Sequence, residues 1–214
     1  MQSNGVKLVV FDLGRVLVRI CDNWQHACKV AGVPVPFRAL DDAAKARMHE
    51  LVCANEIGKL DQAAFCEGAA RLLDAEPEHV SASSNAYLLG AFPGAVRLLE
   101  QLMTLGYETA CLSNTNARHW SIMLDPASPS ALPLDRMTYR FASQEIGLRK
   151  PDDAIYTYVE RVSGKRGSEI VFFDDLDANV AAALRRGWQA HVIRVDADPI
   201  AQVRDHLRAA GVLR

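Results

Sequence analysis

The sequence lacks a surplus of charge of either sign. Its 24 basic and 26 acidic residues nearly cancel, which gives a formal net charge of -2. A chain this close to neutral has no general attraction for a polyanion, so we do not expect a nucleic acid partner. Half of the residues are hydrophobic, which excludes the composition of a disordered chain and is enough for a sizeable core.

Long apolar runs are also missing. No stretch approaches the roughly twenty apolar residues that a membrane-spanning helix needs. The N-terminal stretch MQSNGVKLVVF has no basic region followed by a long apolar segment, so it lacks the pattern of a signal peptide. We therefore expect no membrane partner and a cytoplasmic location.

Cysteine is scarce, and its spacing forms no recognisable pattern. The five cysteines are odd in number and lie far apart, and no two of them form a C-x-x-C pair (Cys21, Cys28, Cys53, Cys66 and Cys111). This spacing favours neither a disulfide framework nor a zinc site. Reduced, buried thiols are the expected state.

The chain does contain a repeated unit, a short apolar run followed by polar residues and then by a helical pattern. The runs lie in KLVVFDLG, YETACLSNTN, YRFASQEIG, EIVFFDDLDAN and QAHVIRVDAD. Helices are predicted to begin near Pro93, Pro151, Asp177 and Pro199 and to stop at the glycines that follow. Strands that are apolar on both faces and alternate with helices predict an α/β fold, in which helices cover both faces of a parallel sheet.

Residues 19–88 interrupt this alternation. The segment is rich in Ala, Leu, Glu and Lys and contains no convincing strand, so several helices inserted after the first strand are predicted. The expected division is a core domain of residues 1–18 and 89–214 with a small helical cap domain of residues 19–88.

Polar side chains follow three of the predicted strands. Asp12 ends the first strand, Ser113 and Asn114 end the second, and Asp174 and Asp175 end the fourth. In an open parallel sheet, ligands bind outside the carboxyl ends of the strands. These side chains are therefore expected to meet in one site.

A lysine and a metal ion would complete such a site. Lys150 precedes a proline, which disfavours a helical backbone, so it can point from a fixed loop. Three nearby aspartates cannot all stay ionised cheaply unless positive charge joins them. Mg²⁺ accepts oxygen ligands and prefers one or two carboxylates together with water and substrate phosphate. The set predicts a site for a phosphate group and Mg²⁺.

Four segments then resemble a known superfamily. VVFDLGRVLV, CLSNTN, GLRKPDDAIY and VFFDDLDAN are similar, in this order, to the four motifs of the haloacid dehalogenase superfamily. LSNTNARH and SQEIGLRKPDDAIYTYV are closer to its branch of α-D-glucose-1-phosphate phosphatases. The resemblance implies a Rossmann-like core and a Mg²⁺-dependent phosphoric monoester hydrolase. The expected partner is a small-molecule phosphate ester, a sugar phosphate, and the expected assembly is a monomer or a weak homo-oligomer.

The resemblance also implies roles for individual residues. Asp12 would attack phosphorus and form an aspartyl phosphate. Mg²⁺ would be held by Asp12, the Gly14 carbonyl, Asp174 and Asp175. The phosphoryl oxygens would be held by Ser113, Asn114 and Lys150, and Lys150 would also act in catalysis by screening charge. Asn179 and His119 match positions that support the site from behind.

Two positions depart from the superfamily pattern. Gly14 stands where many members have an aspartate that protonates the leaving group. Either the substrate compensates with an acidic leaving group, or the cap supplies the proton, with Asp22, His26 and Glu56 as candidates. Arg15 stands where the branch has a small or amide residue. It would contact the phosphate, crowd the pocket or point to solvent.

Two other functions compete with the phosphatase. A metal-independent 2-haloacid dehalogenase would use Asp12 to attack carbon, but the Asp174–Asp175 pair disfavours it because a halocarboxylate would meet surplus negative charge. The other is a non-catalytic protein that binds a phosphorylated metabolite and has lost turnover with the missing acid.

Overall fold

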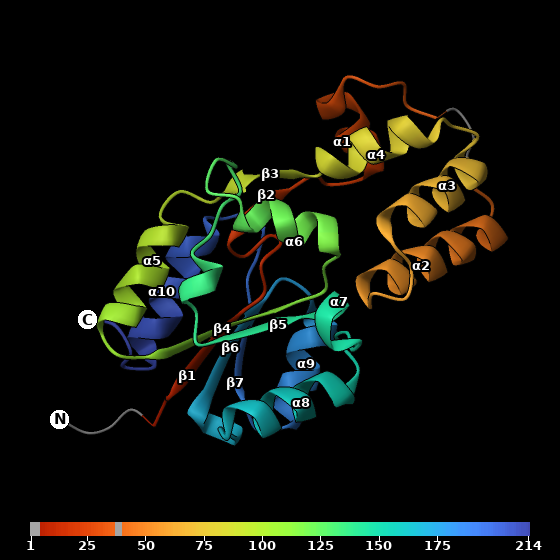
Figure 1. The fold of residues 1–214 in the computed structure, drawn as a ribbon. Helices are drawn as coiled ribbons and strands as arrows, with labels where there is room; N and C mark the ends of the chain where they lie inside the picture. The colour runs from red at the N-terminus through yellow and green to blue at the C-terminus, as the bar shows by residue number, and fades with distance from the viewer. Residues whose placement is uncertain (1–4, 37–39) are drawn as a thin grey trace.

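The computed structural model describes residues 5–36 and 40–214. Residues 1–4 of the predicted core and 37–39 of the predicted cap lie outside the described residues. At the centre is a five-stranded parallel sheet of order β5-β4-β1-β6-β7 (Figure 1). Its strands are β1 (Leu8–Phe11), β4 (Glu108–Ser113), β5 (Tyr139–Ala142), β6 (Ile170–Asp174) and β7 (Gln189–Val192). The predicted parallel sheet is confirmed.

Helices cover both faces of this sheet (Figure 1). On one face lie α5 (Ala95–Thr104), α6 (Ala117–Leu124) and α10 (Pro199–Ala209), and on the other lie α8 (Asp153–Ser163) and α9 (Asp177–Arg185). Along β1, Val9 and Phe11 join the apolar cluster on the first face, whereas Leu8 and Val10 join the cluster on the second. Burying each such side chain stabilises the fold by roughly 1.5–3 kcal/mol. Because the residues alternate between the two clusters, packing on both faces of the sheet stabilises the central strand.

Two helices begin later than their prolines predict. Helix α5 starts at Ala95, because Gly94 before it has a left-handed backbone with φ of 86°. Helix α8 starts at Asp153, because Asp152 before it is extended. The predicted start of α10 is confirmed, since the Asp198 side chain accepts hydrogen bonds from two amides of its first turn.

The inserted segment is helical, as predicted. Its described part forms α1 (Trp24–Ala31), α2 (Asp42–Glu56), α3 (Gln62–Leu73) and α4 (Pro77–Asn85), which we call the helical group. Asn23, Asp41 and Asp61 cap the first three of these helices with their side chains. The helices share a small apolar cluster around Phe65 and Val80. The division into core and cap domains stays a prediction.

The absence of strands from residues 19–88 was predicted wrongly at both ends. Strand β2 (Val18–Ile20) pairs antiparallel with β3 (Leu88–Ala91) at the base of the helical group. Each strand is too short to show an alternating pattern, and the two strands lie at opposite ends of the inserted segment. Local sequence therefore carried no signal for this pair.

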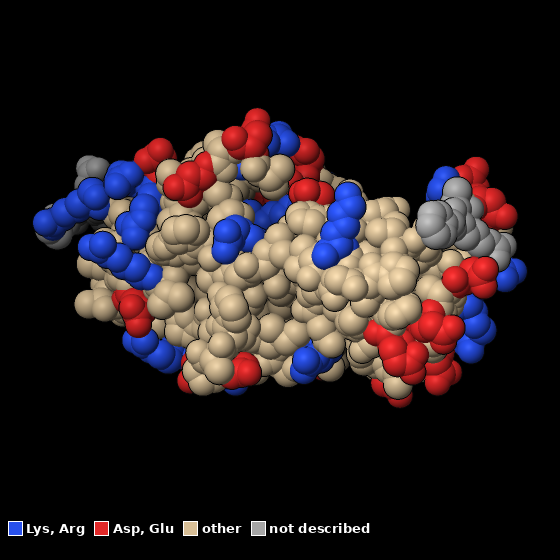
Figure 2. Space-filling model, turned by 90° about the horizontal axis from the view of Figure 1, so that it is seen from above, with Lys and Arg blue, Asp and Glu red and all other residues tan. Residues whose placement is uncertain are grey.

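Three short elements complete the chain. They are helix α7 (Ser143–Ile146) and two 3₁₀ turns, η1 (Leu134–Arg136) and η2 (Gly167–Glu169). The five cysteines are free, and all but Cys53 are buried. Within residues 5–36 and 40–214, no helix has the length and apolar character that crossing a membrane requires. On the face in Figure 2, basic side chains gather at the end near α5 and α10, and acidic ones gather over the helical group.

Candidate active site

The predicted site residues come together because three neighbouring strands end at the same edge of the sheet. Asp12 follows β1, which lies between β4 and β6. Its backbone amide donates to the Phe173 carbonyl over 2.8 Å, which extends the pairing with β6 by one residue. Ser113 ends β4 on one side of Asp12, and Asp174 ends β6 on the other. Asp12 and Asp174 thus lie together at one end of the sheet, and Ser113 ends the strand beside Asp12.

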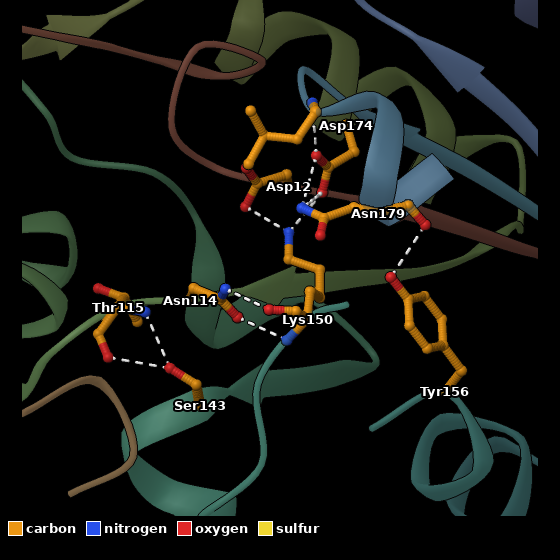
Figure 3. A network of polar contacts seen from close by, with 9 residues as sticks. Asp12, Asn114, Thr115, Ser143, Lys150, Tyr156, Asp174 and Asn179 are labelled. Atoms are coloured by element: carbon orange, nitrogen blue, oxygen red, sulfur yellow. Dashed lines mark hydrogen bonds and ion pairs between the residues drawn. The ribbon is translucent and has the colours of Figure 1, made fainter. Parts of the chain in front are cut away.

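Lys150 lies between two of the carboxylates (Figure 3). Its Nζ is 2.9 Å from Oδ1 of Asp12 and 2.6 Å from Oδ2 of Asp174, and the residue is only 1% exposed. Burial by itself lowers the pKa of Lys150, but the two carboxylates outweigh burial and raise this pKa above its ordinary value. The lysine is therefore charged, and it balances part of the negative charge.

The Asp12 carboxyl group is buried beside other charged groups. Burial raises the pKa of Asp12 to about 7; Lys150 opposes this shift, and Asp174 and Asp175 add to it. Burial also raises the pKa of Asp175, with the Asp174 carboxylate as a further cause. One lysine is thus too little positive charge for three neighbouring carboxylates.

The three carboxylates could hold a metal ion. One oxygen from each of Asp12, Asp174 and Asp175 lies within 4.8 Å of the other two. An all-oxygen donor set with surplus negative charge is what a hard divalent cation binds, so the residues fit Mg²⁺. The Gly14 carbonyl, two residues after Asp12, stays a predicted fourth ligand.

The Asn114 side chain contacts the main chain of Lys150. Its Nδ2 donates to the Lys150 carbonyl over 2.9 Å, and its Oδ1 accepts from the Lys150 amide over 2.9 Å (Figure 3). An amide nitrogen carries two hydrogens, so the predicted contact of Asn114 with a phosphoryl oxygen stays a prediction. In this arrangement Asn114 positions the lysine. Ser113, which is buried at the end of β4, lines a cavity beside these residues.

Asn179, on α9, contacts Asp174. Its Nδ2 lies 2.9 and 3.1 Å from the two Asp174 oxygens, and the Leu176 amide donates to Asp174 Oδ1 over 2.9 Å. Tyr156, which the sequence did not single out, donates from its hydroxyl to the Asn179 carbonyl over 2.9 Å. These contacts fix the orientation of the Asp174 carboxylate. A tyrosine in an apolar helical stripe gives no sequence signal for such a contact.

His119 lies away from the carboxylates. Its Nε2 is 2.8 Å from the Ser84 carbonyl, and its ring stacks on Tyr87 with centroids 6.2 Å apart. Burial lowers the pKa of His119, so the ring is neutral and donates to Ser84 from Nε2. His119 thus joins α6 to the end of α4, and its contacts are not those of the predicted support behind the metal site.

Arg15 points toward the carboxylates. Its backbone is left-handed with φ of 59°, a conformation that favours Gly or Asn. Its Nη1 is 3.6 Å from Oδ2 of Asp175, and its Nη2 is 3.5 Å from the Asp22 carbonyl. Arg15 therefore does not simply point to solvent, because its guanidinium lies beside a carboxylate of the site. Its charge opposes the larger effect of burial, which raises the pKa of Asp175.

The candidate proton donors Asp22 and Glu56 lie beside other ionisable side chains. Oε2 of Glu56 lies 2.9 Å from Arg149 Nη2, and Oδ2 of Asp22 lies 3.3 Å from His26 Nδ1. The Asp22 side chain is also 81% exposed. None of these contacts directs an acid at Asp12.

The end of α2 is fastened to the core through residues that the sequence did not single out. Ser143 Oγ is 2.5 Å from the Glu56 carbonyl and accepts from the Thr115 amide over 2.9 Å. At Gly58, where φ is 71°, a Cβ atom would lie 2.5 Å from the Gln144 carbonyl oxygen. Only glycine fits this close approach. Serine and glycine are too common in loops for the sequence alone to reveal such a junction.

The sequence matches one protein family model and is similar to a known protein. The family model described as haloacid dehalogenase-like hydrolase matches residues 6–187. The chain is 26% identical over 199 residues to acyl-CoA dehydrogenase family member 10 of Mus musculus; the match covers 89% of this chain but 18% of the mouse protein.

Solved structures share the fold. A haloacid dehalogenase family enzyme from Bacteroides thetaiotaomicron has a TM-score of 0.76 at 23% identity, covering 94% of this chain and 99% of the other. A complex of that enzyme with magnesium and inorganic phosphate has a TM-score of 0.72 at 23% identity, covering 90% and 96%. The L-2-haloacid dehalogenase of Xanthobacter autotrophicus has a TM-score of 0.61 at 19% identity, covering 88% and 77%.

Proposed function

The chain belongs to the haloacid dehalogenase-like hydrolase family, and from this premise we propose that it is a Mg²⁺-dependent phosphatase of a small phosphorylated metabolite. The observation that carries the proposal is the group formed by three carboxylates and one buried lysine at the carboxyl end of the sheet. A phosphate monoester needs positive charge around its oxygens and a nucleophile near phosphorus. Asp12 is the nucleophile, and the positive charge would come from Lys150 and from the Mg²⁺ that the carboxylates would hold.

Asp12, Asp174 and Asp175 would hold Mg²⁺, together with the Gly14 carbonyl. When bound, the ion supplies the positive charge that the carboxylates lack and stabilises negative charge on the phosphoryl oxygens. The Bacteroides relative crystallised with magnesium and inorganic phosphate supports this choice of cation and ligand.

The protein's own residues carry the reaction in two steps. An Asp12 carboxylate oxygen attacks phosphorus, the bond from phosphorus to the alcohol oxygen breaks, and that oxygen takes a proton from water. Water then attacks phosphorus and releases inorganic phosphate and the free Asp12 carboxylate. Lys150, 2.9 Å from Asp12, keeps the carboxylate in place and reduces repulsion between it and the incoming phosphate. Ser113 would hydrogen-bond a phosphoryl oxygen.

The leaving oxygen has no aspartate at position 14 to protonate it. Glu56 pairs with Arg149, and Asp22 is 81% exposed and lies 3.3 Å from His26, so neither carboxylate is directed at the leaving oxygen. The proton would then come from water, unless the substrate has an acidic leaving group. An anomeric sugar phosphate has one, since the hemiacetal oxygen is more acidic than that of an ordinary alcohol. The sugar phosphate stays a prediction.

The experiment is to measure inorganic phosphate release from a panel of phosphate monoesters with Mg²⁺ and with EDTA. Asp12→Asn should abolish release, whereas Asp153→Asn, an exposed aspartate on α8, should leave it unchanged. Chloride release from 2-chloropropionate without metal would instead favour the dehalogenase, whose fold is shared. Binding of phosphate monoesters without any release would favour the non-catalytic protein.

A further inference from the structure

A cavity of about 680 Å³ adjoins the candidate active site. It begins at Leu13, Gly14, Ser113 and Asn114, which flank Asp12 in sequence or on the neighbouring strand, and extends among the helices of the helical group. Its volume is in the range of pockets that enclose a small organic ligand. A phosphate held at Asp12 would therefore have its alcohol part in this cavity.

The walls of this cavity away from the carboxylates are mainly apolar. The side chains that form them include Trp24, Met48, Val52, Phe65, Leu73 and Leu88. They come from α1, α2, α3 and β3, so four elements contribute to the apolar lining. Such a surface gains from contact with hydrocarbon and offers a hydroxyl group no hydrogen bond.

Several polar groups in the lining already have partners within the protein. Asn55 Nδ2 donates to the Leu60 carbonyl over 2.9 Å, and the Glu56 carboxylate pairs with Arg149. The ring of His119 is committed to the Ser84 carbonyl. A polyol in the apolar part of the cavity would lose hydrogen bonds to water and find few replacements.

We propose that the alcohol part of the substrate is a hydrocarbon chain, alkyl or arylalkyl, that enters this cavity while its phosphate lies at Asp12. The proposal rests on the proposed phosphatase function and specifies its substrate class. It replaces the polyhydroxylated sugar that the sequence resemblance implies with an apolar alcohol. The attack of Asp12 on phosphorus is unchanged. An alkoxide leaves less readily than a hemiacetal oxygen, so the leaving oxygen takes its proton from water, and the preference for an alkyl ester comes from binding of its chain in the cavity.

The test compares kcat/KM for phosphate release from ethyl, butyl, hexyl and octyl phosphate with that from α-D-glucose 1-phosphate, all with Mg²⁺. We expect kcat/KM to rise roughly threefold per added methylene until the cavity is filled, and hexyl phosphate to exceed the sugar phosphate. A series that is flat with chain length, or a preference for glucose 1-phosphate, would overturn the proposal and leave the phosphatase intact.

Failure of the phosphatase itself has a different signature. If no ester, p-nitrophenyl phosphate included, releases phosphate, calorimetric binding of octyl and ethyl phosphate to the Mg²⁺-loaded protein decides. Tighter binding of octyl phosphate would support the apolar binding site and would contradict only the proposed phosphatase activity. Equal or absent binding of the two esters overturns the apolar site as well.

A wall variant provides a second test. Val52→Asn places a polar group in the cavity, and we expect the octyl-to-ethyl ratio of kcat/KM to fall about tenfold. Val162→Asn, at an exposed position on α8, is the matched control and should leave the ratio unchanged. If Val52→Asn does not fold, Val52→Thr makes the same test with a side chain of nearly the same shape. An unchanged ratio in a folded wall variant would contradict the assignment.

Discussion

The Asn114 side chain is hydrogen-bonded at both ends of its amide to the main chain of Lys150, with two bonds of 2.9 Å each. The lysine side chain then reaches Asp12 and Asp174. Asn114 follows the end of β4, so the sheet edge holds the loop that carries the lysine. The position of the positive charge thus depends on an amide that need not touch the substrate.

Replacing Asn114 with Ala should therefore lower turnover by displacing Lys150. We expect kcat to fall by about 10- to 100-fold, because small displacements of catalytic groups have effects of this size. Steady-state kinetics on the best phosphate ester measures the loss. A near-normal circular dichroism spectrum would show that the fold is kept, and full turnover in the folded variant would contradict the positioning role.

Lys150→Met should reveal how much the lysine stabilises the two carboxylates. Removing one partner of a buried ionic group leaves charge uncompensated, so the free energy of unfolding should fall by about 3–5 kcal/mol at pH 8 without Mg²⁺. Adding Mg²⁺ should stabilise the variant more than the wild type, since the ion would replace the missing charge. Urea denaturation with and without Mg²⁺ makes the comparison. Equal stability of the two proteins without the ion would refute this account.

The position two residues after Asp12 has room for the missing acid. A Cβ atom at Gly14 would meet Ile20 Cδ1 at 3.5 Å, which is an ordinary contact, and the Gly14 backbone is not left-handed. Gly14→Asp should raise kcat on alkyl phosphates, with about 10²-fold as the lower end of what a positioned acid contributes. The gain should be smaller on p-nitrophenyl phosphate, whose leaving group needs no proton. Gly14→Asn is the control of equal shape, and an equal gain in both variants would exclude acid catalysis.

Part of this site could be predicted from the sequence because it depends on where strands end. Asp12, Ser113 and Asp174 each follow or close a short apolar run, and parallel strands bring such ends together. The central sheet was predictable for the same reason. The hydrophobic pattern of each strand and the alternation of strands with helices predict both the sheet and this part of the site.

The remaining parts depend on contacts between segments distant in sequence. The bond from Tyr156 to Asn179, and the contact of Ser143 with Glu56, depend on which rotamers and loop paths the packed fold leaves available. The β2–β3 pair likewise joins the two ends of the inserted segment. The spacing of residues along the chain does not predict which distant segments come into contact.

Arg15 offers a further prediction, on the affinity for Mg²⁺. Its guanidinium lies 3.6 Å from Asp175, so it competes with a cation for that carboxylate. Arg15→Asn removes the charge and introduces a residue that tolerates the left-handed backbone, so Mg²⁺ should bind severalfold more tightly. Titration calorimetry gives the affinity. Arg15→Lys keeps the charge and should stay close to the wild type; identical affinities for the Asn and Lys variants would argue against competition.

The buried ring of His119 predicts a pH dependence of stability. Burial lowers the pKa of His119, and nearby Arg118 adds to this effect. As the pH falls below about 6.5, the unfolded chain takes up a proton that the folded protein resists, so the free energy of unfolding should fall with pH. His119→Gln, which can still donate to the Ser84 carbonyl, should lose less stability between pH 7 and pH 5 in urea denaturation. His49→Gln, at an exposed position on α2, is the control and should follow the wild type. Parallel curves for all three proteins would show that His119 titrates alike in both states.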